Sequence, residues 1–389
     1  MLDQILFHGI HSLEKDVSGF DSERVLDTIH QDEAFGAILT RIPNMRKSNM
    51  KSAVFRQGQG LVFEDLPMLE IDDDQVLIKV ANTGFCGSDH SIVEDGGAAD
   101  GTVLGHEMAG TVAEIGASVQ GVQKGTRVIL RPTYCDSCPG CRNGRPQLCS
   151  NNRRTIGVGD LPGGFAEFVK AYPQMLIPIP DNVDSQSAAL AEAYAVGLHA
   201  IDLTGATGGS ALVIGAGTIG LTVVKLLKIR GFNPIVISEP VAEKRDLARK
   251  FGADIVLDPL SDNLMAEAFQ INSGCGFSSV FECSGLKSQL AVAIDLAGPG
   301  GKVCLLSVLH EDVLVSPINL MFKEVVLYSS YGNTHAENIQ CLKLISEGVL
   351  DPLQLISDWC TLDELPDVYR DRINTGQAIK VMLKIGEEF

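Results

Sequence analysis

Ala211-Leu212-Val213-Ile214-Gly215-Ala216-Gly217-Thr218-Ile219-Gly220 decides the fold of the second half of the chain. Its four leading apolar residues predict a buried strand, and the glycines that follow fit the pattern G-x-G-x-x-G at the start of a helix. In such a turn Gly215 permits the bend, Gly217 lets the backbone approach a pyrophosphate, and Gly220 lets helix and strand pack closely. Because the N-terminus of a helix attracts phosphate, this run predicts a dinucleotide-binding site.

The second half of the chain alternates apolar strands with helical stretches. Strands are expected at residues 211–214, 235–238, 254–257, 279–283, 302–307 and 325–329, with helices such as 222–230 and 241–251 between several of them. This rhythm predicts a doubly wound parallel sheet and therefore the α/β fold class. Cofactor contacts are expected at Gly215, Gly217, Ile219, Gly220 and, where the fifth strand ends, Ser307.

An acidic residue indicates which dinucleotide is bound. Glu239 follows the second of these strands, 19 positions after Gly220 (239 minus 220). A carboxylate there accepts hydrogen bonds from a free ribose 2′-hydroxyl and repels a 2′-phosphate. The sequence therefore favours NAD over NADP.

The first half of the chain has a different character. From about residue 51 to 180, short β-rich segments such as 75–80 and 110–115 are separated by Gly and Asp turns, which predicts a compact, barrel-like β domain. The expected division is residues 1–50 as an extension of unknown role, 51–200 as the catalytic domain, 201–334 as the dinucleotide domain and 335–389 rejoining the first domain. The extension is either loosely attached, or a lid or subunit contact.

Four cysteines lie together in one short polar loop, within a lobe expected at residues 131–150. They are Cys135, Cys138, Cys141 and Cys149. Four thiolates can complete a tetrahedral zinc site and leave no position for a substrate, so a structural zinc is the favoured interpretation. Redox-active cysteines and an iron–sulfur cluster are the alternatives.

A second group of metal ligands is expected from Gly84-Phe85-Cys86-Gly87-Ser88-Asp89-His90 and Gly105-His106-Glu107. A thiolate, an imidazole and a carboxylate can hold zinc with one coordination position left open, as catalytic sites require. Taken singly, Cys86 could be a small buried residue and His106 an ordinary turn histidine. Their combination with Ser88 and Glu107 in glycine-rich turns favours a catalytic metal. His90 could belong to a proton path or be a plain surface histidine.

Composition limits the partners. The chain has 389 residues, 45% hydrophobic and 21% charged, with a formal net charge of −18. This length predicts two domains, and the acidic balance argues against nucleic acid because no basic stripe is available to neutralise phosphates. An apolar run long enough to span a membrane and a secretory leader are both missing, so we expect no membrane partner and a cytoplasmic location.

With these motifs in hand, the chain resembles the zinc-dependent medium-chain dehydrogenase/reductase (alcohol dehydrogenase) superfamily, in its polyol (sorbitol) and threonine dehydrogenase branch. The resemblance runs from about residue 51 to the end and rests on the two stretches quoted above, the four-cysteine lobe, Gly163-Gly164-Phe165-Ala166-Glu167 and the glycine fingerprint. It implies a GroES-like catalytic domain beside a Rossmann domain, and a homotetramer or homodimer.

The resemblance also implies roles for individual residues. Cys86 and His106 would bind the catalytic zinc, with Glu107 a ligand or close neighbour. Glu192 aligns with an acid that binds this zinc directly or through water, although the usual Glu-Pro pair is Glu192-Ala193 here. The cysteine lobe would hold a structural zinc, giving two zinc ions per subunit.

The reaction expected is the reversible oxidation of a secondary alcohol or polyol to a ketone with NAD. Ser88 would pass the hydroxyl proton toward solvent through the cofactor ribose and His90, and the nicotinamide would receive the hydride. The alternatives are an amino-alcohol or cyclitol dehydrogenase, an NADP-dependent ketone reductase and a catalytically silent binding protein.

Overall fold

The computed structural model of the protein describes residues 49–260, 263–309 and 311–389. The extension expected at residues 1–50 therefore lies, apart from its last two residues, outside the described residues. The domain boundaries expected from the sequence stay predictions.

A six-stranded parallel sheet organises the second half of the chain. Its strands are β9 (Ala211–Ile214), β10 (Ile235–Ser238), β11 (Ile255–Leu257), β12 (Phe277–Glu282), β13 (Ala297–Leu305) and β14 (Val326–Ser329). Every neighbouring pair is parallel, and the strand order is β11-β10-β9-β12-β13-β14. This order reverses direction beside β9, as in dinucleotide-binding sheets. The predicted doubly wound parallel sheet is confirmed.

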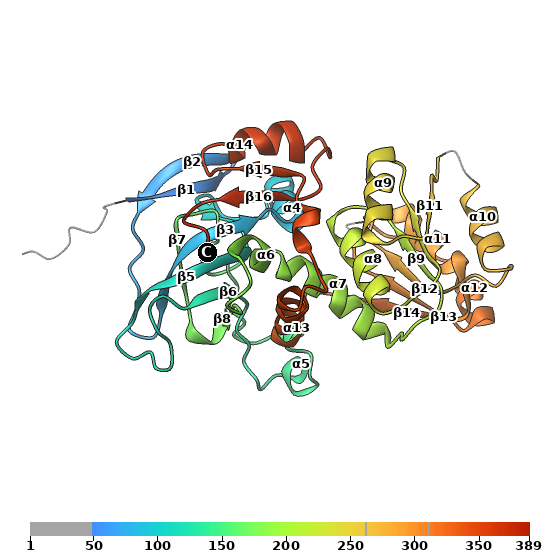
Figure 1. Cartoon of the computed structure of the whole chain (residues 1–389), viewed down its shortest axis with the longest axis horizontal. Coiled ribbons are helices and arrows are strands. Elements are labelled where there is room, and N and C mark those ends of the chain that lie inside the picture. Colours follow the sequence, from blue (N-terminus) through green and yellow to red (C-terminus); the bar gives the residue numbers. More distant parts are fainter. Residues whose placement is uncertain (1–48, 261–262, 310) are drawn as a thin grey trace, which may run out of the picture. The chain divides into compact units, whose positions relative to one another are not determined.

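Helices cover both faces of this sheet because each strand buries its alternate side chains on opposite sides. Ala211 and Val213 of β9 pack in one core with α8 (Thr218–Ile229) and α9 (Ala242–Phe251). Leu212 and Ile214 belong to the other core, which includes side chains from α10 (Leu264–Ile271), α11 (Lys287–Leu296) and α12 (Pro317–Lys323). Figure 1 shows these helices around the sheet, in yellow to orange.

The first half of the chain is rich in antiparallel strands. A three-stranded sheet has the order β2-β1-β4, and a seven-stranded sheet has the order β15-β16-β3-β5-β6-β8 with β7 also paired to β3. The strands are β1 (Asn49–Arg56), β2 (Gly60–Pro67), β3 (Val76–Gly84), β4 (Thr102–Val103), β5 (Glu107–Ile115), β6 (Arg127–Leu130), β7 (Phe168–Ala171), β8 (Leu176–Pro178), β15 (Asp358–Cys360) and β16 (Val381–Lys384).

The C-terminal segment contributes directly to this seven-stranded sheet. β16 lies antiparallel to β3, with Met382 opposite Gly84 and Leu383 opposite Thr83, and β15 lies parallel to β16. Figure 1 shows the red C-terminal strands beside the blue strand β3. Residues from the end of the chain therefore reach the strand that leads into Cys86.

The remaining helices connect and cover these sheets. They are α4 (Gly87–Asp95), α5 (Pro139–Arg142), α6 (Ser185–Ala189), α7 (Ala191–Thr204), α13 (His335–Ser346) and α14 (Leu365–Val368), with 3₁₀ turns at Pro146–Leu148, Pro173–Met175 and Pro352–Leu355 and a π-helical turn at Tyr369–Ile373. Most of α7 is buried, since it packs in one core with Ile129 of β6 and with α8.

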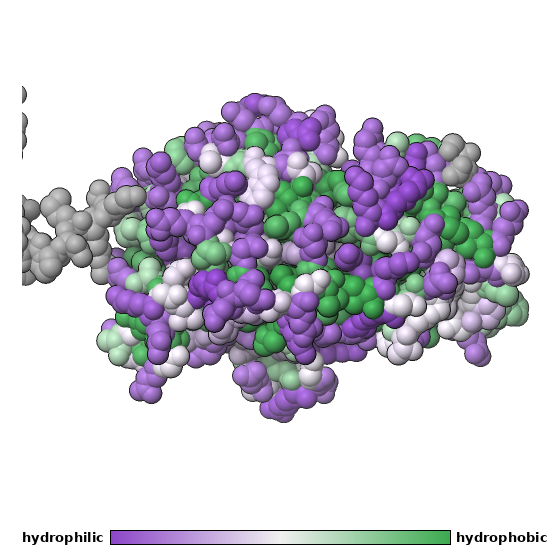
Figure 2. Space-filling model, in the orientation of Figure 1, coloured by the Kyte–Doolittle hydropathy of each residue, from purple (hydrophilic) through white to green (hydrophobic). Residues whose placement is uncertain are grey.

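Polar side chains cover much of the face shown in Figure 2, with apolar residues scattered between them. None of the helices in the described part of the chain combines the length and apolar character needed to cross a bilayer.

Candidate functional site

The fold brings together three of the residues that the sequence singles out. The thiol of Cys86, the imidazole of His106 and the carboxylate of Glu107 offer ligand atoms that all lie within 4.8 Å of one another. Cys86 is the N-cap of α4, and Glu107 begins β5 opposite Gly84, the last residue of β3. A Cβ atom at Gly84 would lie 2.2 Å from Glu107 Oε2, so this position needs glycine to make room for the carboxylate.

Asp89 joins the two turns that carry these ligands. It is fully buried and accepts hydrogen bonds from the backbone N–H of Cys86 at 3.0 Å and of Gly105 at 3.3 Å. Its Oδ1 also lies 3.4 Å from His106 Nδ1, while His106 Nε2 lies 3.4 Å from Ser88 Oγ. A carboxylate behind one ring nitrogen is the usual device that fixes a metal-binding histidine. Asp89 was missed by the sequence analysis, although an acid three residues after an N-cap is a capping-box signal.

The environment of His106 favours its charged form in the metal-free protein. Burial opposes the charge, but the neighbouring Asp89 and Cys86 together raise the pKa of the imidazole well above its usual range. A metal ion must bind the neutral ring, so metal uptake would displace a proton from this histidine.

A buried lysine pairs with Glu107 and was also missed. Lys380 Nζ lies 2.6 Å from Glu107 Oε2 and 2.8 Å from Oε1, and it donates to the carbonyl of Phe85 at 3.0 Å. The lysine is 2% exposed and the glutamate 1%. Burial lowers the pKa of the ammonium, but Glu107 and Cys86 raise it above its usual value. The two residues are 273 positions apart, so no local pattern could reveal the pair.

Glu192 lies close to this group but makes different contacts. Its Oε1 accepts hydrogen bonds from Arg131 Nη1 at 3.1 Å and from Asn333 Nδ2 at 2.9 Å. Burial raises the pKa of Glu192, but the charges of Arg131 and His106 lower it overall. The carboxylate is therefore within electrostatic reach of His106, although it does not belong to the compact set of ligand atoms.

His90 contacts the C-terminal segment. Its Nδ1 lies 3.0 Å from the hydroxyl of Tyr369, which donates to Glu94 Oε1 at 2.7 Å. Tyr369 is the first residue of the π-helical turn. These contacts anchor α4 to the end of the chain, and the part expected of His90 in proton transfer stays a prediction.

The donor set of the first group fits zinc. A thiolate, an imidazole and a carboxylate are the ligands that this ion takes in sites with an open position. The buried ammonium of Lys380 and guanidinium of Arg131 offset two carboxylates. A divalent cation bound here would be compensated by the thiolate that Cys86 offers to a metal.

The four cysteines of the lobe also come together. Their sulfur atoms all lie within 4.8 Å of one another, with Cys138 and Cys141 at 3.5 Å and Cys135 and Cys141 at 3.9 Å. The backbone N–H groups of Cys141 and Ser150 lower the pKa of the Cys138 thiol to about 5, whereas burial raises that of Cys141 to about 12. Four soft ligands at this spacing fit a closed zinc site.

The glycine-rich turn has the geometry that its sequence predicts. Gly215 has φ of +96°, and a Cβ atom there would lie 2.9 Å from Ser284 Cα. A Cβ atom at Gly220 would lie 1.9 Å from the carbonyl oxygen of Gly215, whereas Gly217 faces open space. Gly217 is the N-cap of α8, and Ile219 packs partly buried against the core below.

Glu239 closes the glycine-rich turn from the end of β10. Its Oε2 accepts from the backbone N–H of Ala216 at 2.8 Å and its Oε1 from that of Val241 at 2.9 Å. The carboxylate therefore lies at the glycine-rich turn, and its contact with a ribose stays a prediction. Ser307 lies beyond β13, and its hydroxyl donates to the buried Glu282.

Comparison with known proteins gives matches over most of the described chain. The family model of the alcohol dehydrogenase GroES-like domain matches residues 72–181, and that of the zinc-binding dehydrogenase matches residues 218–347. L-threonine 3-dehydrogenase of Rhizobium etli (strain CIAT 652) is 32% identical over 347 residues, which cover 87% of this chain and 99% of that protein. Sorbitol dehydrogenase of Bacillus subtilis (strain 168) is 29% identical over 348 residues, which cover 86% and 97%.

A solved structure has the same architecture. A protein of Sinorhizobium meliloti 1021, determined bound to NADP, superposes with a TM-score of 0.80 at 31% identity, over 87% of this chain and all of that one. The GroES-like and Rossmann-like architecture expected from the sequence is confirmed.

Proposed function

Because the chain belongs to the zinc-binding alcohol dehydrogenases of the medium-chain dehydrogenase/reductase superfamily, we propose that it reversibly oxidises a secondary alcohol or polyol to a ketone with NAD. The observation that carries this proposal is the group of Cys86, His106 and Glu107 within 4.8 Å, with Ser88 beside it. Such a group has the donors of a catalytic metal site and a hydroxyl that can move a proton.

Each residue of the group has a part in the proposed reaction. Cys86, His106 and Glu107 would hold zinc, with Glu192 in reach, and the four cysteines of the lobe would hold a second, structural zinc. When bound, the first zinc supplies a Lewis acid that favours ionisation of a hydroxyl. Ser88 Oγ lies 3.4 Å from His106 Nε2, where it can receive the substrate proton. Asp89 keeps the imidazole oriented, and Lys380 keeps Glu107 in place.

The proposed cofactor is NAD, because Glu239 puts a carboxylate at the glycine-rich turn. NADP is the second candidate, and a specific observation favours it. Arg245 donates to the main-chain carbonyls of Glu239 and Pro240 and pairs with Asp258 at 3.1 Å, so a cation lies next to the end of β10. An arginine near this position can accommodate a 2′-phosphate, and the similar protein of Sinorhizobium meliloti was solved with NADP.

The substrate class has two candidates. The similarity to sorbitol dehydrogenase favours a polyol, and the similarity to L-threonine 3-dehydrogenase favours an amino alcohol. A cationic amino group would gain from acidic residues at the site, and Asp89, Glu107 and Glu192 are buried there. Arg131 and Lys380 already pair with the two glutamates, so we rank the uncharged polyol first.

The test is NADH or NADPH formation by zinc-loaded protein with polyols, cyclitols, simple secondary alcohols and L-threonine. Turnover of one class above the others with NAD supports the proposal. Turnover only with NADP would replace the assigned cofactor. If NAD is the cofactor, Glu239→Ala should improve the use of NADP, because it removes the carboxylate that repels a 2′-phosphate. No turnover with any alcohol, at full zinc content, would contradict the proposed function.

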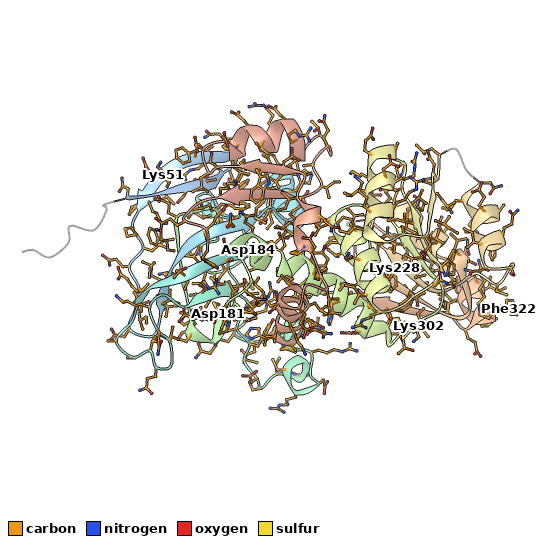
Figure 3. All side chains as sticks on the ribbon, viewed as in Figure 1. Lys51, Asp181, Asp184, Lys228, Lys302 and Phe322 are labelled. Carbon is orange, nitrogen blue, oxygen red and sulfur yellow. The ribbon has the colours of Figure 1, made fainter. Side chains whose placement is uncertain are left out.

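We also propose that the protein is a homo-oligomer assembled through β14 and α12. Val326 and Leu327 of the edge strand β14 are 46% and 43% exposed, and Phe322 of α12, at the outer end of this region in Figure 3, is 76% exposed. An exposed apolar edge strand is a template for pairing with a second copy. Leu327→Lys should shift the mass measured by light scattering to that of the monomer, and an unchanged mass would reject this surface.

A further inference from the structure

A buried ion pair fixes Glu192 beside the group of Cys86, His106 and Glu107. Arg131 Nη1 donates to Glu192 Oε1 at 3.1 Å, and the two side chains are 8% and 11% exposed. Asn333 Nδ2 donates to the same oxygen at 2.9 Å. Two donors, one of them charged, therefore hold a single oxygen of this carboxylate.

The two donors are themselves held in place. Arg131 follows β6 directly, and its backbone N–H binds the carbonyl of Met175 at 2.9 Å. Asn333 Oδ1 accepts from Asn338 Nδ2 of α13 at 2.8 Å. Glu192 lies in the first turn of α7. Three separate elements thus meet at Oε1, which gives the carboxylate little rotational freedom.

The second oxygen of Glu192 remains available. Within the described residues, both hydrogen bonds to this carboxylate end on Oε1 and none is assigned to Oε2. Ala191 of α7 and Ala109 of β5 pack in one core, so the first turn of the helix that carries Glu192 lies against the strand that begins with Glu107. Arg131 Nε is buried without a partner in the described chain, so this guanidinium depends on Glu192.

We propose that Arg131 and Asn333 are positioning residues that hold Glu192 by Oε1 and so keep Oε2 available to the metal. This inference rests on the proposed function, because it assumes that zinc binds at Cys86 and His106. Outer partners of metal ligands typically change metal affinity or activity by about 10- to 100-fold when they are removed.

The primary test is zinc retention by Arg131→Met, measured as zinc content after dialysis against increasing chelator. Cys86→Ser protein gives the zinc held by the cysteine lobe alone. We expect Arg131→Met to lose the remaining zinc at about tenfold less chelator and to lower kcat about tenfold, with KM for NAD unchanged. Arg131→Lys should recover part of both. Arg127→Met is the matched control, because Arg127 begins β6, the strand that Arg131 directly follows, and binds the carbonyls of Pro180 and Val183.

A double-mutant cycle separates positioning from general destabilisation. In a Glu192→Gln background, Arg131→Met should change zinc retention by less than about twofold, since the two residues would act as one unit. Asn333→Leu should act in the same direction as Arg131→Met, and it carries the test if that variant does not fold.

Two outcomes would overturn the inference. One is zinc retention and kcat in Arg131→Met equal to those of Arg127→Met. The other is the full effect of Arg131→Met in the Glu192→Gln background. Zinc retention is measured without substrate, so it tests this inference separately from the proposed function. If only the proposed function is wrong, the wild-type protein will bind zinc but turn over no alcohol.

Discussion

The two metal-ligand groups of this protein are built in different ways. The cysteine lobe draws its four ligands from residues 135–149, next to short helical turns and in a partly exposed segment. The group of Cys86, His106 and Glu107 begins a helix and a strand of the β-rich sheet, and Asp89 and Lys380 support it from behind. The first group is local in sequence, whereas the second depends on the whole fold.

This difference teaches what holds each group together. Few buried apolar residues support the lobe. Between residues 135 and 149 the buried residues are Cys138, Cys149 and Gln147, and the first two are proposed metal ligands. The proposed structural zinc would then supply much of the folding free energy of the lobe. The second group sits on strands that pack in the core, so its ligands are organised before a metal arrives. Loss of a ligand should therefore affect stability at the lobe and chemistry at the second group.

The largest effect is expected from Cys86→Ser. Removing the soft ligand of the proposed catalytic zinc should lower kcat/KM at least about a thousandfold, which corresponds to roughly 4 kcal/mol of transition-state stabilisation. The thermal unfolding temperature should change little, because the sheet remains intact. Steady-state NADH formation and circular dichroism measure the two quantities.

Zinc content gives the control for this first prediction. We expect two zinc ions per chain in the wild type and one in Cys86→Ser. Cys275→Ser, which changes an exposed cysteine outside both groups, should retain two zinc ions and full activity. A Cys86→Ser protein with wild-type turnover would contradict the conclusion that the group of Cys86, His106 and Glu107 carries the chemistry.

The next largest effect is a loss of stability, which we expect from a substitution in the cysteine lobe. Cys141→Ser should remove the structural zinc and lower the free energy of unfolding by several kcal/mol, on the order of 3–5, because four thiolates organise this segment. Activity at low temperature should fall much less than in Cys86→Ser. Chemical denaturation with and without added zinc measures the change. An unfolding free energy equal to that of Cys275→Ser would show that the lobe folds without metal.

Lys380→Met tests whether the second group is organised by its surroundings. It leaves the carboxylate of Glu107 buried without its cation, which typically costs about 3–5 kcal/mol. Lys380→Arg should retain most of the stability, because the charge remains. Lys228→Met is the matched control, since its pair with Asp254 is partly exposed and worth at most about 1 kcal/mol. Equal unfolding free energies for the two methionine variants would contradict the proposed role of Lys380.

The sequence predicted the parts of the molecule that depend on local pattern. The strands at residues 211–214 and 235–238 agree with β9 and β10 to the residue, because short apolar runs bounded by glycine and polar residues have one favourable location in a parallel sheet. The fifth strand was predicted to reach Ser307, whereas β13 ends at Leu305. The four cysteines and the trio of Cys86, His106 and Glu107 come together as their spacing suggested.

The partners of these residues could not be predicted in the same way. Lys380 meets Glu107 because β16 pairs with β3, and Arg131 meets Glu192 because β6 and α7 share a core. A lysine or arginine far along the chain has no spacing that marks its partner. His90 shows the same limit, since its contact with Tyr369 depends on the packing of the C-terminal segment.

The smallest effect on stability is expected where the cysteine lobe meets α7 and α13. Gln147, two residues before Cys149, contacts His199 of α7 at 3.1 Å, and His199 Nδ1 lies 2.6 Å from Glu337 Oε1. Burial raises the pKa of Glu337, but its hydrogen bonds with His199 and Thr334 lower it overall. Glu337→Gln should lower the free energy of unfolding at pH 6 by about 1–2 kcal/mol.

The lowered pKa of Glu337 determines how its contribution to stability changes with pH. An acid whose pKa is lowered in the folded state stabilises the protein above its unfolded pKa of about 4.3 and loses that contribution as the pH falls through the folded value. The difference in free energy of unfolding between wild type and Glu337→Gln should therefore be constant near neutral pH and shrink below about pH 4. Glu347→Gln, at the exposed end of the same helix, should show almost no difference at any pH. If the loss of unfolding free energy in Glu337→Gln persists unchanged at acid pH, the contact between His199 and Glu337 acts through packing. Ionisation of Glu337 would then play no part in holding the cysteine lobe to α7.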